Sequence, residues 1–188
     1  TCRVLAQAGA IVAVTDVRAE RADQVAREIE DSGGRALALR LDVRDEETGP
    51  EVLRALAERH GGMLALINNA GVDVTLPIDE LTVGQWDLVV DTNLRGPFVL
   101  CRAAAMLMKR QASGHIVNVA STAAKRGWPN ASAYHASKWG LLGLSHALHA
   151  ELRPFGVRVC AVSAGGMRTP FLLERFPDID PANLQDPE

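Results

Sequence analysis

The sequence predicts an α/β fold built on a doubly wound parallel β-sheet. Five short apolar runs are continuous rather than alternating, which is typical of strands buried on both faces. Helical segments separate these runs, and strands separated by helices pair in parallel through right-handed crossovers. The chain has 188 residues, 47% of them apolar and 23% charged, so we expect a single domain over residues 1–188.

The predicted strands and the first helices follow in order along the chain. The strands are 11–15, 36–41, 64–67, 115–119 and 157–162. Residues 18–31 form an amphipathic pattern, with Val25, Ile29 and the alanines facing inward. This helix ends at Gly33-Gly34, because glycine tolerates the positive φ of a helix stop. Residues 45–60 repeat the pattern and stop at Gly61-Gly62.

Two later helices, predicted at 84–110 and 134–152, point to association between subunits. From Trp139 to Leu152 the helix is apolar on nearly every side. Either it is buried in a large domain, or one face packs on the sheet and the other on a partner, and the length of the chain favours the second. We therefore expect a homodimer or homotetramer that associates through these two helices.

Composition excludes several classes of function. The net charge is −3 and no basic run exceeds two residues, so nucleic acid is not an expected partner. No apolar stretch approaches the roughly 18 residues that span a bilayer, so no membrane association is expected. The cysteines Cys2, Cys101 and Cys160 form no C-x-x-C pair, which indicates neither a disulfide framework nor a metal site. A reduced, cytoplasmic setting fits best.

Tyr134 and Lys138 form the first candidate catalytic pair. Tyr134 is the only tyrosine, Lys138 is one of three lysines, and an i, i+4 pair on a helix shares one face. A nearby ammonium favours the phenolate, and lowering a tyrosine pKa from about 10 to about 7 needs roughly 4 kcal/mol. Such a tyrosine is a general acid/base near neutrality. The alternative is a hydrogen-bonded pair on a helix surface.

Three further features share the same order along the chain. The motif Asn68-Asn69-Ala70-Gly71 follows the strand 64–67, Asn93 lies in the predicted helix 84–110, and Ser121 follows the strand 115–119, thirteen residues before Tyr134. Together with the Tyr-x-x-x-Lys pair, they resemble the single-domain branch of the short-chain dehydrogenase/reductase family. The resemblance runs from residue 1 to about residue 171.

The resemblance implies a role for each member of this set. Tyr134 would exchange a proton with the carbonyl or alcohol oxygen, and Ser121 would hydrogen-bond that oxygen. Lys138 would bind the nicotinamide ribose and lower the tyrosine pKa, and Asn93 would hold a water that links Lys138 to solvent. From the residues alone, Ser121 is equally an ordinary strand-end hydroxyl, and Asn93 a helix asparagine bonded to a neighbouring carbonyl.

Asp16 indicates which dinucleotide would bind. It follows the strand 11–15, where a Rossmann-like arrangement places an acid that bonds the adenine ribose 2′-OH and repels a 2′-phosphate. This favours NAD. Arg18 keeps NADP as the alternative, because its guanidinium could meet a 2′-phosphate. Asp16 is also a candidate N-cap of the next helix.

The resemblance implies three further cofactor contacts. Asp42 and Val43 match the turn beside the adenine, and Asn69, Ala70 and Gly71 would run beneath the adenosine and the nicotinamide ribose. The segment that closes over the nicotinamide matches Gly165, Met167 and Thr169. Ala164 stands where the family usually has proline, which loosens this turn.

The glycine-rich phosphate loop of the Rossmann pattern is not found in the sequence. That loop precedes the acid by about 20 residues, which places it just before Thr1. We therefore expect a preceding strand between those at 11–15 and 64–67, and a further helix and strand after the last residue, so that the sequence is a piece of a longer enzyme. An incomplete gene, or a strand supplied by another subunit, is the alternative.

These observations lead to an expected function. The resemblance implies an NAD(P)-dependent oxidoreductase that interconverts a secondary alcohol and a ketone, both small molecules. The apolar residues Phe171, Leu172, Leu173 and Phe176 indicate a nonpolar substrate portion, or simply a helix packing face. The competing hypothesis is a non-catalytic member of the same fold that senses a nucleotide or mediates dimerisation.

Overall fold

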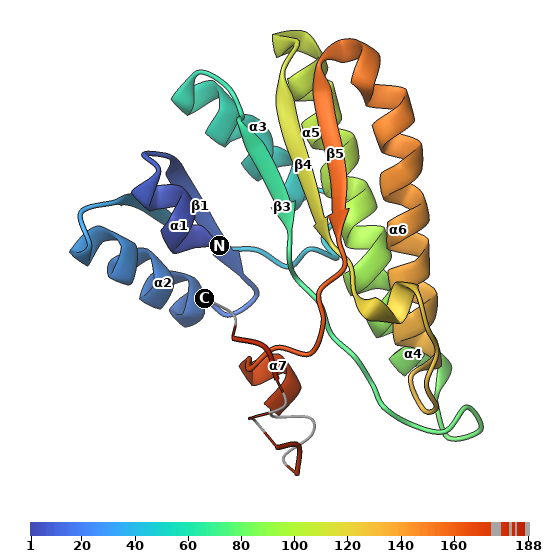
Figure 1. The fold of residues 1–188 in the computed structure, drawn as a ribbon. Helices are drawn as coiled ribbons and strands as arrows, with labels where there is room; N and C mark the ends of the chain where they lie inside the picture. The colour runs from blue at the N-terminus through green and yellow to red at the C-terminus, as the bar shows by residue number, and fades with distance from the viewer. Residues whose placement is uncertain (174–177, 181, 183, 187–188) are drawn as a thin grey trace.

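The computed structural model, which describes residues 1–173, 178–180, 182 and 184–186, has the predicted α/β architecture (Figure 1). Helices and strands alternate along the chain, and the three strand pairs between the named strands are parallel. The strands are β1 (Ile11–Asp16), β2 (Arg35–Arg40), β3 (Ala65–Asn68), β4 (Gly114–Val119) and β5 (Val157–Val162). Each lies within two residues of its predicted position.

The strands form two separate sheets. β1 pairs with β2, while β3, β4 and β5 pair in that order. Among the described residues β1 is not hydrogen-bonded to β3. The register places Asp16 beside Arg40 and Asn68 beside Asn118. Polar residues therefore meet where the strands end, as expected for a site at the carboxyl edge of a parallel sheet.

Two groups of helices cover the two sheets. α1 (Cys2–Gln7) and α2 (Ala19–Asp31) pack with β1 and β2 around a core that includes Ile29. α3 (Thr48–His60), α5 (Gly96–Gln111) and α6 (Ser132–Leu152) pack with β3, β4 and β5 around Met108 and Ile116. The two remaining α-helices of the described residues are α4 (Val83–Val90) and α7 (Pro170–Leu173). None of the helices in the described part of the chain has the length and apolarity needed to cross a membrane.

The predicted helix 45–60 begins three residues later than expected, at Thr48. The cause is Asp45, whose carboxylate accepts hydrogen bonds from the backbone N–H groups of Glu47 and Thr48 and from the Thr48 hydroxyl. A short acidic side chain that takes up these backbone donors holds residues 45–47 in a turn. The helix stop at Gly61 is as predicted, with a left-handed φ of 73°.

The predicted helix 84–110 is interrupted by a π-helical turn, η1 (Asp91–Arg95). The Gly96 N–H bonds the carbonyl of Asp91, five residues back, instead of the carbonyl four residues back. Pro97 follows and has no N–H, so it cannot make the α-helical hydrogen bond to the carbonyl of Asn93. The widened turn lies at Asn93, one of the predicted site residues, and such π turns are frequent at functional sites.

Candidate active site

Helix α6 carries Tyr134 and Lys138 on one buried face, as their spacing predicts. Tyr134 is 8% exposed and Lys138 is 4% exposed. The Lys138 Nζ lies 5.6 Å from the centroid of the Tyr134 ring and donates a hydrogen bond of 2.8 Å to the carbonyl of Val119, at the end of β4. The pair is therefore buried between α6 and the sheet, and the interpretation as a surface pair on the helix is wrong.

The charge of Lys138 depends on two opposing effects. Burial lowers its pKa to about 8, because desolvation disfavours the ammonium, and the negative charge of Asp73 acts in the opposite direction. A lysine with this pKa is still mainly cationic at pH 7. It can therefore stabilise a phenolate at Tyr134 under neutral conditions.

Ser121 lies two residues after the end of β4 and is nearly buried. Its hydroxyl accepts a hydrogen bond of 3.1 Å from the Ala123 N–H and so begins the turn η2 (Thr122–Ala124). The N–H of Thr122, the residue directly after Ser121, donates a hydrogen bond to the carbonyl of Ala164, which follows β5. Lys138 donates a hydrogen bond to the carbonyl of Val119, two residues before Ser121. The end of β4 therefore connects Ser121 to Tyr134 and Lys138 on α6.

Asn93 joins the loop after β3 to helix α6. Its Oδ1 accepts a hydrogen bond of 2.8 Å from the Val72 N–H, and its Nδ2 donates one of 2.8 Å to the Val72 carbonyl. The same Nδ2 donates to the Ser137 hydroxyl, which donates to the carbonyl of Tyr134. Asn93 is fully buried, and its two bonds to Val72 set the path of the chain beside Lys138.

The segment Asn69 to Gly71 crosses this site directly after β3. Asn69 and Ala70 are exposed, and Gly71 is half-buried. A side chain at Gly71 would place its Cβ 3.5 Å from Asn93 Oδ1 and 3.7 Å from Lys138 Nζ. The backbone at Gly71 therefore passes close to the Lys138 ammonium. Because glycine has no side chain, a ribose can approach the backbone closely at this position.

A buried polar network behind the site was not predicted. Asn68 Nδ2 donates to Asn118 Oδ1 at 2.8 Å, and Asn118 Nδ2 donates to the Ser145 hydroxyl at 2.8 Å. Asn68 also contacts the Cys101 thiol, whose pKa burial raises to about 11. These bonds join β3, β4, α5 and α6. The only sequence signal for this network was the presence of Asn118 in the apolar run 115–119. One asparagine in a strand does not identify the side chains to which it is hydrogen-bonded.

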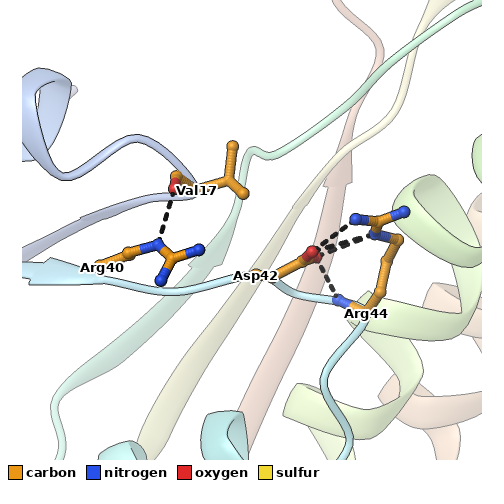
Figure 2. Close-up of polar contacts among 4 residues, drawn as sticks. All are labelled: Val17, Arg40, Asp42 and Arg44. Atoms are coloured by element: carbon orange, nitrogen blue, oxygen red, sulfur yellow. Dashed lines mark hydrogen bonds and ion pairs between the residues drawn. The ribbon is translucent and has the colours of Figure 1, made fainter.

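The predicted adenosine side lies at the ends of β1 and β2. Asp16 Oδ1 accepts a hydrogen bond of 2.9 Å from the Arg18 N–H, but the residue that precedes α2 is Arg18, with no side-chain cap, so the N-cap interpretation of Asp16 is wrong. Arg40, beside Asp16 in the register, donates from Nε to the carbonyl of Val17 at 3.2 Å (Figure 2). Asp16 is thus flanked by two exposed arginines.

Asp42 and Val43 form the turn after β2. The Asp42 carboxylate accepts hydrogen bonds from the backbone and the guanidinium of Arg44, as Figure 2 shows, and these bonds hold the pKa of Asp42 below its usual range. The Val43 carbonyl meets α5 at Gly96, where a Cβ would lie 2.8 Å from that oxygen. The turn is therefore fixed from both sides.

The segment after β5 holds Gly165, Met167 and Thr169. Met167 forms a bridge with Gln185, whose N–H bonds the Gly166 carbonyl. Ala164 donates its N–H to the carbonyl of Val162, a bond that the family's usual proline could not make.

Helix α7, which follows this segment, reaches Tyr134. The Phe171 ring lies 6.2 Å from the Tyr134 ring, centroid to centroid. Leu172 and Leu173 are half-buried. The last of the predicted substrate-loop residues, Phe176, lies outside the described residues.

Comparison with known proteins gives consistent matches. The family model for short chain dehydrogenases matches residues 1–180. A cis-4-hydroxycyclohexanecarboxylate dehydrogenase of Sinomonas cyclohexanicum is 38% identical over 173 residues, which cover 92% of this chain and 69% of that protein. The 3beta-hydroxysteroid dehydrogenase 1 of Eggerthella lenta is 36% identical over 160 residues, 85% of this chain and 61% of that protein.

A solved structure matches the fold closely. It is a protein described as an NAD(P)-dependent gluconate 5-dehydrogenase, from Beutenbergia cavernae, with NADP bound at low occupancy. Its TM-score is 0.88 at 34% identity, and the match covers 94% of this chain and 70% of that one. The chain thus spans between about six and seven tenths of the length of these relatives.

Proposed function

Because the chain belongs to the short-chain dehydrogenase family of oxidoreductases, we propose that it interconverts a secondary alcohol and a ketone with NAD(P), and that Tyr134 is the acid/base. The observation that carries the proposal is the burial of Tyr134 and Lys138 on one face of α6, beside the turn that begins at Ser121. When bound, the nicotinamide ring supplies or accepts the hydride.

The residues of the site divide the proton chemistry between them. Tyr134 donates a proton to the carbonyl oxygen in reduction and accepts one from the alcohol in oxidation, while Ser121 hydrogen-bonds the same oxygen. The Lys138 ammonium stabilises the phenolate and is placed to bond the nicotinamide ribose, for which the bare backbone at Gly71 leaves room. These assignments follow the general requirements of acid/base catalysis.

Asn93 is proposed to hold the water that connects Lys138 to solvent. Its side-chain amide is already bonded to Val72 and Ser137, so the main-chain carbonyl is the proposed acceptor for this water. Pro97 cannot donate to that carbonyl, which supports the main-chain oxygen in this role.

The remaining predicted residues are proposed to bind the cofactor. Asp16 lies at the end of β1, where its carboxylate favours the 2′-OH of NAD, although Arg18 keeps NADP as the alternative. The adenine is proposed to contact the turn at Asp42 and Val43. We propose that Asn69, Ala70 and Gly71 run beneath the adenosine and the nicotinamide ribose. The segment from Gly165 is proposed to close over the nicotinamide, with Thr169 and the Met167 backbone near the carboxamide.

The substrate is proposed to be a secondary alcohol with an apolar body. Phe171 lies beside Tyr134, and Leu172 and Leu173 follow it on α7. The names of two relatives denote substrates whose hydroxyl group is borne on a ring. A ring-borne hydroxyl with an apolar skeleton is therefore the first class to test. The free thiols of Cys2, Cys101 and Cys160 support the further proposal of a cytoplasmic setting.

The test is the variant Tyr134→Phe in the full-length protein, assayed with NAD and NADP against a panel that includes cyclohexanol and cyclopentanol. We expect turnover to fall at least about 10²-fold, which is the contribution of a general acid/base, because the variant lacks the phenolic oxygen that exchanges the proton. The affinity for NADH, followed by nicotinamide fluorescence, should stay within about twofold. Undiminished turnover in the variant would contradict the assignment of Tyr134. Cofactor binding by the wild type without turnover of any alcohol would favour the non-catalytic hypothesis.

A further inference from the structure

Asp73 is an acidic residue of the loop that borders the site, and it has no role in the set described above. It directly follows Val72, whose N–H and carbonyl are both hydrogen-bonded to the side chain of Asn93. It also lies two residues after Gly71, where the backbone passes within contact distance of the Lys138 Nζ. Two hydrogen bonds to a fully buried side chain therefore fix the backbone that presents the Asp73 carboxylate.

One oxygen of the Asp73 carboxylate is shielded from water, and the residue as a whole is half-buried. Its Oδ1 atom has less than 1 Å² of exposed surface. A buried carboxylate is costly unless another charge or dipole compensates it. Charge interactions are also stronger at such a position than at the surface, since less solvent screens them.

Lys138 needs such a negative charge. Its ammonium is buried, and its hydrogen bond in the structure goes to the neutral carbonyl of Val119. Burial favours the uncharged amine, and the charge that opposes this effect is that of Asp73. The Tyr134 phenol, on the same helix, is a second titratable group beside Lys138. A neutral lysine would give no electrostatic support to a phenolate.

We propose that Asp73 is a positioning residue of this site, whose partly shielded carboxylate keeps Lys138 charged and so supports proton transfer at Tyr134. The charge effect on Lys138 stands by itself, whereas its consequence for proton transfer rests on the proposed function. Asp73 acts through Lys138, and no contact with substrate is assigned to it.

The experiment measures the charge of Lys138 without using turnover. The sequence holds three lysines, Lys109, Lys125 and Lys138, so protein labelled with ¹³C at the lysine Cε gives a separate NMR signal for each of them, whose pH titration can be followed. The signal that is lost in Lys138→Met identifies Lys138. The full-length protein is compared with Asp73→Asn, Asp73→Glu and the control Asp79→Asn, which changes an exposed acid of the same loop.

We expect Lys138 to lose its proton at lower pH in Asp73→Asn than in the wild type, because the negative charge of Asp73 then no longer opposes the effect of burial. Asp73→Glu should restore most of the difference, and Asp79→Asn should show none. The pH at which turnover falls on the alkaline side should move down together with the Lys138 titration. Lys109 and Lys125 should titrate alike in every variant.

Two results would overturn the proposal. One is a Lys138 titration that Asp73→Asn leaves unchanged, and the other is an equal shift in Asp79→Asn. Should Asp73→Asn fail to fold, as judged by circular dichroism, Asp73→Ser removes the same charge in a smaller side chain and is read in the same way. Because the NMR titration requires no catalysis, it decides the role of Asp73 even if the wild type turns over no alcohol.

Discussion

At the residue scale, the end of β1 holds charges that favour opposite cofactors. The Asp16 carboxylate suits a free 2′-OH and repels a 2′-phosphate. Arg18 and Arg40 flank it, and Arg40 is held toward β1 by its hydrogen bond to the Val17 carbonyl. A related structure contains NADP, so at least one member of the family accommodates a 2′-phosphate. The preference between NAD and NADP that Asp16 and the two arginines set is therefore a measurable property of the protein.

We predict that the full-length protein binds NADH at least about tenfold more tightly than NADPH, a difference of ~1.4 kcal/mol. Asp16→Ala should reduce this preference or invert it, because the two arginines then face a 2′-phosphate without a competing carboxylate. Fluorescence titration with each reduced cofactor measures both affinities. Asp23→Ala, which removes an exposed acid from α2, serves as the control and should leave the ratio unchanged. Tighter binding of NADPH by the wild type would contradict the prediction.

At the scale of the elements, the turn before β5 depends on one glycine. Gly156 has a φ of 74° and follows the turn η3 (Arg153–Phe155). A Cβ at this position would lie 2.3 Å from the carbonyl oxygen of Ala112, just after α5. The glycine therefore allows the backbone after α5 to lie against the backbone before β5, where the register of β4 with β5 begins at Gly114 and Val157.

We predict that Gly156→Ala lowers the free energy of unfolding by at least about 2 kcal/mol, from the left-handed φ together with the backbone clash. Urea denaturation followed by circular dichroism measures the change. Gly84→Ala is the matched control, since that glycine lies in α4 with nothing within 4 Å of an added Cβ. Its stability should be unchanged or slightly higher, because alanine favours a helix over glycine. Equal stability of the wild type and Gly156→Ala would show that the turn relaxes.

At the scale of the whole molecule, α5 and α6 present apolar side chains to solvent. Phe98 and Met106 on α5 and Trp139 on α6 are each about half exposed. Phe98 and Met106 line a groove between the two helices together with Lys109 and Leu148. Two long helices with one face on the sheet and an apolar outer face favour association of subunits through these helices.

We predict a dimer or tetramer at micromolar concentration, measured by light scattering. Met106→Glu should lower the measured mass toward that of the monomer, because it would bury a charge in the interface. Ile78→Glu is the control, since it places the same charge at an exposed apolar position in the loop before α4. A monomeric wild type would remove the basis of the prediction.

Several particular elements show how far the sequence could be interpreted. The strands were predictable because buried parallel strands have continuous apolar runs, and the pairing of Tyr134 with Lys138 followed from helix geometry alone. The delayed start of α3 was not predicted, since Asp45 could equally have lain inside the helix. The π turn at Asn93 was also missed, although Pro97 marked a position where the regular hydrogen bonds must fail.

By itself the sequence determined the order of strands and helices, the family and the four residues proposed to carry the chemistry, because periodicity and motif spacing are properties of the chain alone. Only the tertiary structure decided which groups surround them. The bonds of Asn93 to Val72, the network from Asn68 to Ser145 and the charge of Asp73 near Lys138 all join residues at least 21 positions apart. The physical reason is that burial and long-range contact set the protonation of Lys138, and neither can be deduced from local sequence.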